Sequence, residues 1–310
     1  MKLRDTIQYY VRGLCGTNRL LKELSGIKKR DAFYHYENRR NQLIEHILHD
    51  TESGVSTQKY VNHDIIVSLT TYGERVHEVA FTIESVMQQS MKPNRIILWL
   101  DYSFKNQRLP QSLLNQQKRG LEIAFCKDLR SYKKLIPSLH KFPNDAIITL
   151  DDDLLYDYDI IEHLILPYLE NPQYIYSCRG HQMLFDQEHQ LLPYIDWHWN
   201  VSELGCIEHY FFTSGGGTLF PPGSLDEEVL NEEVFMAICP LADDVWLNAM
   251  ALKKGTIVRK VYTRDKKGED YILNWELQDA GLCMTNVLQN KNDIQIKDVF
   301  SRYSLYDKLI

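Results

Sequence analysis

The sequence predicts an α/β protein with a mostly parallel sheet flanked by helices, preceded by an N-terminal helical extension. Short apolar runs alternate with segments of helical periodicity from Asp64 onwards, which is the pattern of strands joined by crossover helices. Two of these runs stop at acidic residues, as strands do when they end at a ligand-binding edge of a sheet. A chain of 310 residues is long enough to bury the core of such a sheet.

Four apolar runs of strand length form the first part of the predicted sheet, and right-handed helical crossovers join them. We expect strands at 65–70, 95–100, 121–125 and 146–150 and helices at 76–89, 110–119 and 131–142. Ser131 is the expected N-cap of the third helix, because a serine hydroxyl can accept a hydrogen bond from the backbone N–H groups of a first turn.

The alternation becomes looser after residue 153. We expect helices at 158–169, 230–239 and 243–253 and strands at 174–178, 210–220 and 256–262. Three glycines, Gly215 to Gly217, interrupt the strand at 210–220. Residues 180–208 show no clear period, which predicts a long functional loop or a pair of edge strands.

Residues 1–50 have the apolar spacing of three short amphipathic helices. These helices either pack together and close one side of the main domain, or dock on a membrane surface or a partner. Lys28-Lys29-Arg30 and Arg39-Arg40 supply the positive charge that docking needs. The predicted organisation is an N-terminal helical extension at 1–60, an α/β domain at 61–265 and a C-terminal segment at 266–310 that packs on this domain.

Charge and cysteine content narrow the classes of partner. The net charge is −7, yet residues 1–50 hold ten Lys or Arg against six Asp or Glu, so a basic N-terminal segment, the basic head, precedes an acidic remainder. The acidic remainder argues against binding of nucleic acid, whereas the basic head could bind an anionic surface. The six cysteines occur singly, which indicates reduced thiols. Without an apolar run of about 18 residues or a signal-peptide core, we expect a cytoplasmic protein, at the inner face of the cell membrane if its head binds lipid.

The functional hypothesis depends most on Asp151, Asp152 and Asp153, the acidic tip, which follow the buried strand at 146–150. Adjacent carboxylates repel one another unless a cation or strong donors lie beside them. In an extended chain Asp151 and Asp153 point to one side and Asp152 to the other, which places two hard oxygen ligands together. An isolated acidic triplet is also compatible with a solvated turn.

Six motifs follow one another between residues 64 and 262: IVSLTTYGERV, ILWLD, RSYKKLIP, TLDDD, TSGGGTLFPP and LADDVWL. In this order and spacing they resemble the GT-A-fold nucleotide-sugar glycosyltransferases, especially family-2-like bacterial enzymes of capsule, lipopolysaccharide and other surface glycans. The resemblance implies a GT-A, Rossmann-like fold. It also implies transfer of a sugar from a nucleoside-diphosphate sugar, UDP in first place, to a hydroxyl of a glycan or lipid-linked acceptor.

The resemblance gives the acidic tip two roles. Asp153 and Asp151 would hold Mn²⁺ or Mg²⁺, which stabilises the charge on a departing diphosphate, and Asp151 or Asp152 would contact the ribose. The further donor contacts that it implies are Thr70, Thr71, Tyr72, Arg75, Asp101, Lys133, Lys134, Gly216 and Gly217. Neighbouring helical positions diverge by about 100°, so only one of the two lysines faces the diphosphate, and we favour Lys134.

Asp243 and Asp244, the acidic pair, begin a predicted helix. The resemblance implies that one of them is the general base of an inverting transfer, because the acceptor hydroxyl must lose a proton as it attacks. Our hypothesis makes Asp244 the base, with Asp243 capping the helix and contacting the acceptor. The reversed assignment, a retaining outcome and a plain capping role of both acids stay open.

Other residues have two interpretations each. A third metal ligand in similar enzymes is often a histidine beyond the acidic motif, and packing is the alternative role of the candidates His181, His198 and His209. Stacking on a sugar face competes with core packing for Trp197, Trp199 and Trp246.

Two other functions compete with glycosyl transfer. A metal-dependent phosphatase or phosphotransferase also uses an Asp-x-Asp motif, but there the motif normally ends the first strand, whereas here it follows the fourth and continues into Leu154-Leu155. A non-catalytic scaffold in a glycan-assembly complex is the second alternative. Hydrolysis of a nucleotide sugar with Mn²⁺ would separate an enzyme from a scaffold.

Overall fold

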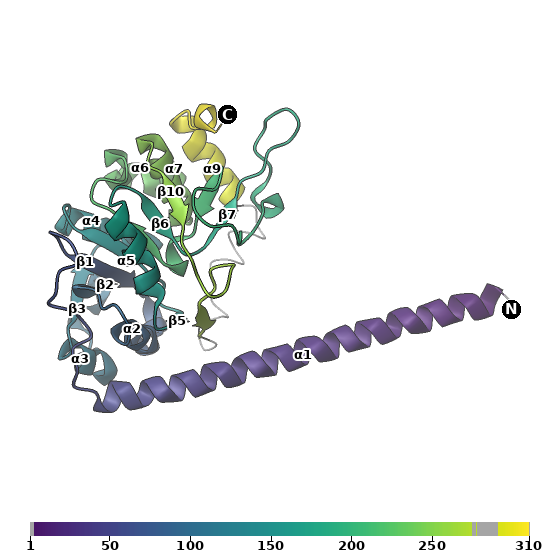
Figure 1. Ribbon diagram of the computed structural model, residues 1–310, viewed down its shortest axis with the longest axis horizontal. Coiled ribbons are helices and arrows are strands. Elements are labelled where there is room, and N and C mark those ends of the chain that lie inside the picture. The colour runs from purple at the N-terminus through teal and green to yellow at the C-terminus, as the bar shows by residue number, and fades with distance from the viewer. Residues whose placement is uncertain (1–2, 275–276, 278–290, 310) are drawn as a thin grey trace.

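The computed structural model describes residues 3–274, 277 and 291–309, and its centre is a seven-stranded sheet (Figure 1). The strand order is β10-β6-β9-β4-β1-β2-β3, and β9 runs antiparallel to β4 and β6 while the other pairings are parallel. The bounds are β1 Ile65–Thr70, β2 Arg95–Asp101, β3 Leu121–Cys126, β4 Ala146–Thr149, β6 Ile175–Ser177, β9 Thr218–Phe220 and β10 Val258–Lys260. The predicted Rossmann-like α/β fold is confirmed.

Helices cover both faces of this sheet. Ile148 of β4 packs in one core with α2, α5 and the end of α1, whereas its neighbour Ile147 packs in a second core with α6, α7 and α9. The bounds are α2 Val79–Met87, α3 Gln111–Gln117, α4 Ile136–Lys141, α5 Ile160–Glu170, α6 Glu232–Ile238, α7 Asp243–Lys254 and α9 Lys291–Arg302. The two cores hold the ends of β1 and β4 in fixed positions between them.

Two local predictions were wrong. Ser131 caps no helix, because residues Arg130–Lys134 form a 3₁₀ turn and Pro137 sets the start of α4 behind it. The strand expected at 210–220 is two strands. β8 (Tyr210–Phe212) pairs with β7 (Gly180–Gln182) in a separate small sheet, and a turn at Ser214–Gly216 leads to β9 in the main sheet. The glycines allow this change of sheet because Gly217 adopts a φ of 104°.

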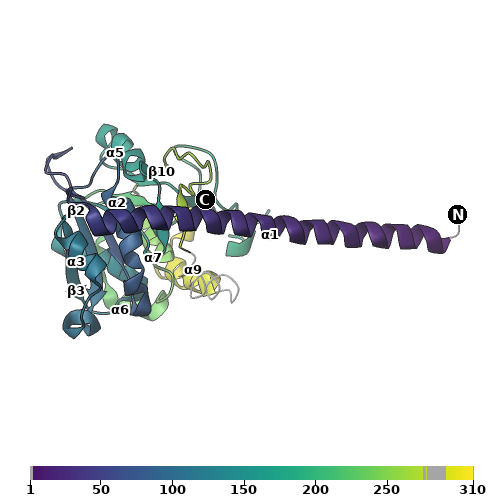
Figure 2. The same cartoon turned by 90° about the horizontal axis from the view of Figure 1, so that it is seen from below.

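The N-terminal residues form one helix, α1 (Leu3–His49), in place of the three predicted segments. The stretch contains no proline, and isolated glycines weaken a helix without ending it. Residues 23–35 are exposed, and Tyr36 is the first buried side chain along the described part, followed by Leu43 and Ile47. Figures 1 and 2 show the N-terminal part of α1 projecting far from the domain, so the predicted packing against the domain holds only for the C-terminal part of the helix, which carries Tyr36, Leu43 and Ile47.

Buried charges fix the C-terminal end of α1. Arg119 pairs with the fully buried Glu84 of α2 at 2.8 Å and also lies 3.6 Å from Asp50, just after α1. Its guanidinium donates to the carbonyls of His46 and Glu52. In the part of the chain that the structure describes, no helix is long and apolar enough to cross a membrane.

Candidate functional site

The acidic tip lies in a turn between β4 and the short strand β5 (Leu154–Tyr156). Asp152 is buried and accepts hydrogen bonds from Thr71 Oγ1 at 2.6 Å and Arg75 Nη1 at 2.7 Å. Arg75 Nη2 lies 3.4 Å from Asp153 Oδ2. Asp152 and Asp153 therefore share one cation, and the acidic tip is not the extended segment that we predicted, because the backbone forms a turn at these two residues.

Lys134 joins the acidic tip to the acidic pair. Its Nζ lies 2.7 Å from Asp151 Oδ1 and 3.1 Å from Asp243 Oδ2, although the two carboxylates belong to distant parts of the sequence. The side chain is buried, which lowers its pKa. The charges of Asp151, Asp243 and Asp244 outweigh that effect and raise the pKa well above its usual value. Lys134 is thus a permanent cation at the centre of the site.

Ser214 holds Asp244 at the start of α7. Its backbone N–H donates to Asp244 Oδ1 at 2.9 Å and its hydroxyl lies 2.5 Å from the same oxygen. Burial, followed by the charge of Asp243, raises the pKa of Asp244 to about 6. Ala242 occupies the N-cap position of α7, so neither acid of the pair is the cap that we predicted for Asp243.

The triple glycine lets the acidic tip approach the turn that carries Ser214. A Cβ on Gly215 would lie 1.7 Å from Asp151 Oδ2, so only glycine leaves room for this carboxylate. Tyr156 Oη accepts from the N–H of Asp151 at 2.8 Å and donates to the carbonyl of Gly215 at 2.5 Å. A Cβ on Gly216 would lie 2.9 Å from that of Arg179. In this structure the groups that lie close to Gly215 and Gly216 are thus side chains of the protein itself, those of Asp151 and Arg179.

The tip carries more negative charge than its cations balance. Burial, followed by the charges of Asp151 and Asp152, raises the pKa of Asp153 to about 6 against the lowering effect of Arg75. No group of three or more His, Cys, Asp or Glu side chains in the described ranges is arranged to hold a metal ion. Asp151 and Asp153 are the carboxylates that would hold a divalent cation here, since Mg²⁺ commonly binds through one or two carboxylates and would neutralise the excess negative charge.

The other predicted donor contacts lie around the ends of β1 and β2. Asp101 accepts from the N–H of Ser103 at 2.8 Å. Lys133 pairs with Asp128 at 3.0 Å and Asp101 at 3.6 Å, whereas Lys134 is the lysine at the acidic tip. Thr70 Oγ1 donates to the carbonyl of Trp99 at 2.8 Å.

Tyr72 is 46% exposed, and the guanidinium of Arg75 lies 5.1 Å from the centre of its ring. Arg75 was predicted to bind phosphate, yet both of its terminal nitrogens contact the acidic tip. Tyr72 therefore presents an aromatic ring to solvent directly beside the cation that holds Asp152 and Asp153.

Two of the three candidate histidines, His181 and His209, have packing contacts. His181 accepts from the N–H of Asn200 at 3.0 Å, its ring centre lies 5.0 Å from that of Trp199, and burial lowers its pKa to about 3. His209 packs on Phe185. The backbone of His198 pairs with Gln182.

Two of the candidate tryptophans are buried in a core. Trp246 donates to the carbonyl of Val229, and Trp197 donates to the carbonyl of Leu192. Trp199 remains 38% exposed and donates to the carbonyl of Tyr194. These contacts match the packing interpretation for Trp197 and Trp246, while Trp199 keeps part of its ring in solvent.

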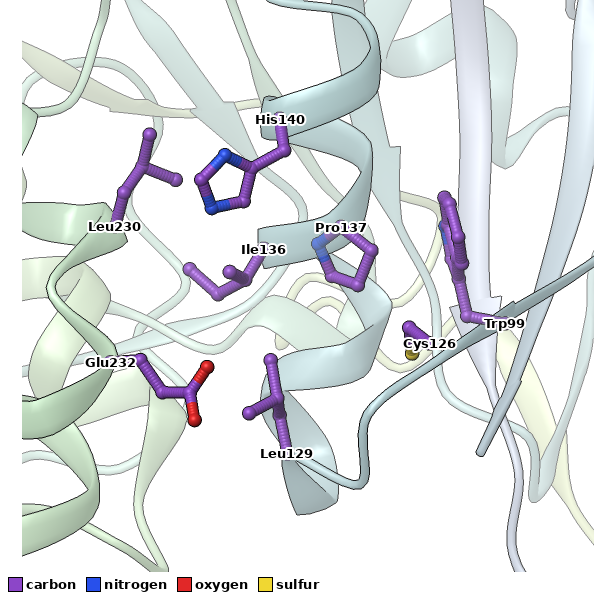
Figure 3. Close-up of a pocket in the computed structure, with 8 residues that line it drawn as sticks. All are labelled: Trp99, Cys126, Leu129, Ile136, Pro137, His140, Leu230 and Glu232. Atoms are coloured by element: carbon purple, nitrogen blue, oxygen red, sulfur yellow. The ribbon is translucent and has the colours of Figure 1, made fainter. Parts of the chain in front are cut away.

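A surface cavity of about 280 Å³ is lined in part by residues of β2, β3 and α4 (Figure 3). Its walls are Trp99, Cys126, Leu129, Ile136, Pro137, His140, Leu230 and Glu232. None of the predicted site residues lines it, so the candidate site is defined by its carboxylates and cations and not by this cavity.

Two supporting residues, Tyr156 and Ser214, were not among the predicted site residues. Like the predicted Thr71, each of them holds a carboxylate or its backbone. The sequence signal for Ser214 is its place before the three glycines. Tyr156 gives no such signal, because a tyrosine in an apolar strand is most often a core residue.

No protein-family model and no curated protein matches the sequence. Among solved structures, the chain is similar to the inositol-1-phosphate CTP transferase from T. maritima, with 12% identity and a TM-score of 0.40 over 65% of this chain and 86% of that chain. It is also similar to CMP:2-keto-3-deoxy-manno-octonic acid synthetase complexed with CTP, with 11% identity and a TM-score of 0.35 over 63% and 88% of the two chains. At these values the likeness carries no conclusion about substrate.

Proposed function

We propose that the protein is a metal-dependent glycosyltransferase that moves a sugar from a nucleoside-diphosphate sugar, UDP-sugar in first place, to a hydroxyl of a glycan or glycolipid in surface-polysaccharide synthesis. The observation that carries the proposal is the convergence of Asp151 and Asp243 on the buried Lys134, within 2.7 and 3.1 Å. It lies beyond the carboxyl end of β4, where open α/β sheets bind ligands. Asp151 and Asp153 would hold Mn²⁺ or Mg²⁺, which supplies positive charge to a departing diphosphate when bound.

Asp244 is the proposed general base. A base works best when its pKa lies near the working pH, and a pKa of about 6 leaves Asp244 ionised at pH 7 and still basic enough to take a proton. The two bonds from Ser214 hold one carboxylate oxygen in place. The proton passes from the acceptor hydroxyl to Asp244 as the oxygen bonds to the anomeric carbon and the nucleotide leaves from the opposite face. The proposed outcome is inversion.

Ligand-induced stabilisation tests the proposal directly. We expect UDP or a UDP-sugar to raise the melting temperature with Mn²⁺ and much less without it, because only ligands that bind the folded state stabilise it. A concentration of 100 times the dissociation constant adds about 2.7 kcal/mol to the free energy of unfolding. Asp153→Ala is the matched control and should abolish the Mn²⁺-dependent part. A panel of nucleotides and nucleotide sugars that leaves the melting temperature unchanged would contradict the proposal.

We propose peripheral contact of α1 with an anionic membrane as part of this function. Leu24, Ile27 and Tyr34 are more than half exposed and lie near Lys28-Lys29-Arg30 on the projecting part of the helix. Apolar side chains beside basic ones are typical of helices that lie in a lipid headgroup layer. Such contact would bring the domain to a lipid-linked acceptor.

Vesicle sedimentation tests this contact. We expect the protein to sediment with phosphatidylserine-rich vesicles, which retain it in the pellet, and to stay in the supernatant with phosphatidylcholine vesicles. Reversal of Lys28, Lys29 and Arg30 to glutamate should abolish retention, since each basic residue near such a surface contributes about 1 kcal/mol. Reversal of the exposed Lys266 and Lys267 is the control and should leave retention unchanged. Equal binding of both variants to anionic vesicles would refute a role of α1.

A further inference from the structure

A segment much later in the sequence returns to the acidic tip. Strand β11 (Tyr271–Leu273) pairs antiparallel with β5, directly after the tip. Asn274, the next residue, donates its backbone N–H to the carbonyl of Asp153 at 2.8 Å. The backbone of the last acid of the tip is thus held by a residue more than a hundred positions later in the sequence.

Asn274 and Arg75 close a ring of hydrogen bonds around this acid. The carbonyl of Asn274 accepts from the N–H of Leu277 at 3.1 Å, and the carbonyl of Leu277 accepts from Arg75 Nη2 at 3.1 Å. Arg75 in turn contacts Asp152 at 2.7 Å and Asp153 at 3.4 Å. Displacement of Asn274 would therefore move both the backbone and the cation partner of Asp153.

The N-terminal helix holds this ring. Tyr36 of α1 is 0% exposed, and its hydroxyl donates to Asn274 Oδ1 at 2.9 Å across a fully buried contact. Leu43 and Ile47 on the same helix are buried in the core with α2, and the guanidinium of Arg40 lies 4.7 Å from the ring centre of Phe81. Tyr36 thus stands on a part of α1 that packs against the domain, at the boundary where the projecting part begins.

We propose that Asn274, held by the hydroxyl of Tyr36, is a positioning residue for Asp153 and Arg75, so that the N-terminal helix belongs to the donor-binding site. The inference rests on the proposed function, from which it takes the role of Asp153. Neither Tyr36 nor Asn274 is a ligand here. They act through the peptide group of Asp153 and through the carbonyl of Leu277, as partners outside the ligand shell orient a metal-binding carboxylate.

Titration calorimetry with Mn²⁺ on the full chain tests the inference with Tyr36→Phe, which removes a single oxygen atom. We expect Mn²⁺ affinity to fall about tenfold, the size of effect that loss of such an orienting partner has at metal sites. Tyr168→Phe is the matched control, because Tyr168 is also 0% exposed and its hydroxyl lies 2.7 Å from His63 Nε2. It should lower the melting temperature without changing Mn²⁺ affinity.

Asn274→Ala keeps the backbone bond to Asp153 and removes the acceptor of the Tyr36 hydroxyl. We expect it to reproduce the loss of Mn²⁺ affinity, and the double variant to lose no more than either single one, because both remove the same link. Equal Mn²⁺ affinity of Tyr36→Phe and Tyr168→Phe, in a protein whose Mn²⁺ binding requires Asp153, would overturn the positioning role alone. Absence of Mn²⁺ binding in the unsubstituted protein would overturn this inference together with the proposed function.

Discussion

Replacement of Asp244 by asparagine is expected to lower kcat by about 10²- to 10⁴-fold, the usual contribution of a positioned general base. The amide can still accept the two hydrogen bonds from Ser214, so the geometry at the start of α7 should persist. Donor binding should therefore remain near normal by thermal shift, while sugar transfer is lost. Asp243→Asn is the comparison variant. If Asp243→Asn loses transfer and Asp244→Asn keeps it, the base is Asp243.

The pKa of Asp244 gives the same variant a second signature. The value rises from 3.8 to about 6 on folding, so the folded protein binds this proton more tightly than the unfolded chain does. Protonated Asp244 therefore contributes to the free energy of unfolding. This contribution is fully present below about pH 4 and is lost as the pH rises through about 6. Asparagine does not ionise and loses no such stability. As the pH rises from 5 to 7.5, the free energy of unfolding of Asp244→Asn should therefore increase relative to that of the unsubstituted protein.

Activity should move in the opposite direction with pH. The ionised carboxylate is the proposed base, so kcat/KM of the unsubstituted protein should rise between pH 5 and pH 7, with a midpoint near the pKa of about 6. Urea unfolding at the two pH values and an initial-rate profile provide the measurements. A pH-independent stability difference between the two proteins would contradict the raised pKa.

The first four strands were predictable because each is a short apolar run and helical segments separate them. Ile65–Thr70 and Ala146–Thr149, for example, lie inside the expected ranges. The shape of α1 was not predictable from its apolar spacing, since spacing indicates which face packs and not whether a partner exists. The same limit applies to Tyr36, whose partner Asn274 lies 238 positions away.

The site itself was predictable in residue type but not in pairing. Charge alone marks Asp151 and the acidic pair as candidates, whereas the backbone turn after Leu150 decides that Asp151 faces Lys134 and that Asp152 faces Arg75. Gly215 shows the same difference. A glycine at this place in the sequence indicates that another group lies too close for a side chain. That this group is the carboxylate of Asp151 is visible only in three dimensions.

Replacement of Lys134 by methionine is expected to destabilise the fold by about 3–5 kcal/mol at pH 7.5, because removal of one partner leaves buried charges uncompensated. Methionine retains much of the side-chain volume and removes the ammonium group that lies between Asp151 and Asp243. Lys133→Met is a neighbouring control. Lys133 is also buried, but its closer partner, Asp128, is 64% exposed and can regain water.

The destabilisation by Lys134→Met should shrink as the pH falls. Lys134 lowers the pKa of the buried Asp244, so without this cation Asp244 takes up a proton more readily in the folded protein than in the unfolded chain. Stability that is absent at pH 7.5 should therefore return at pH 5, as urea unfolding would measure. If Lys134→Met and Lys133→Met are equally stable at both pH values, Lys134 does not hold the two acidic motifs together. The convergence from which the catalytic proposal starts would then lack an energetic basis.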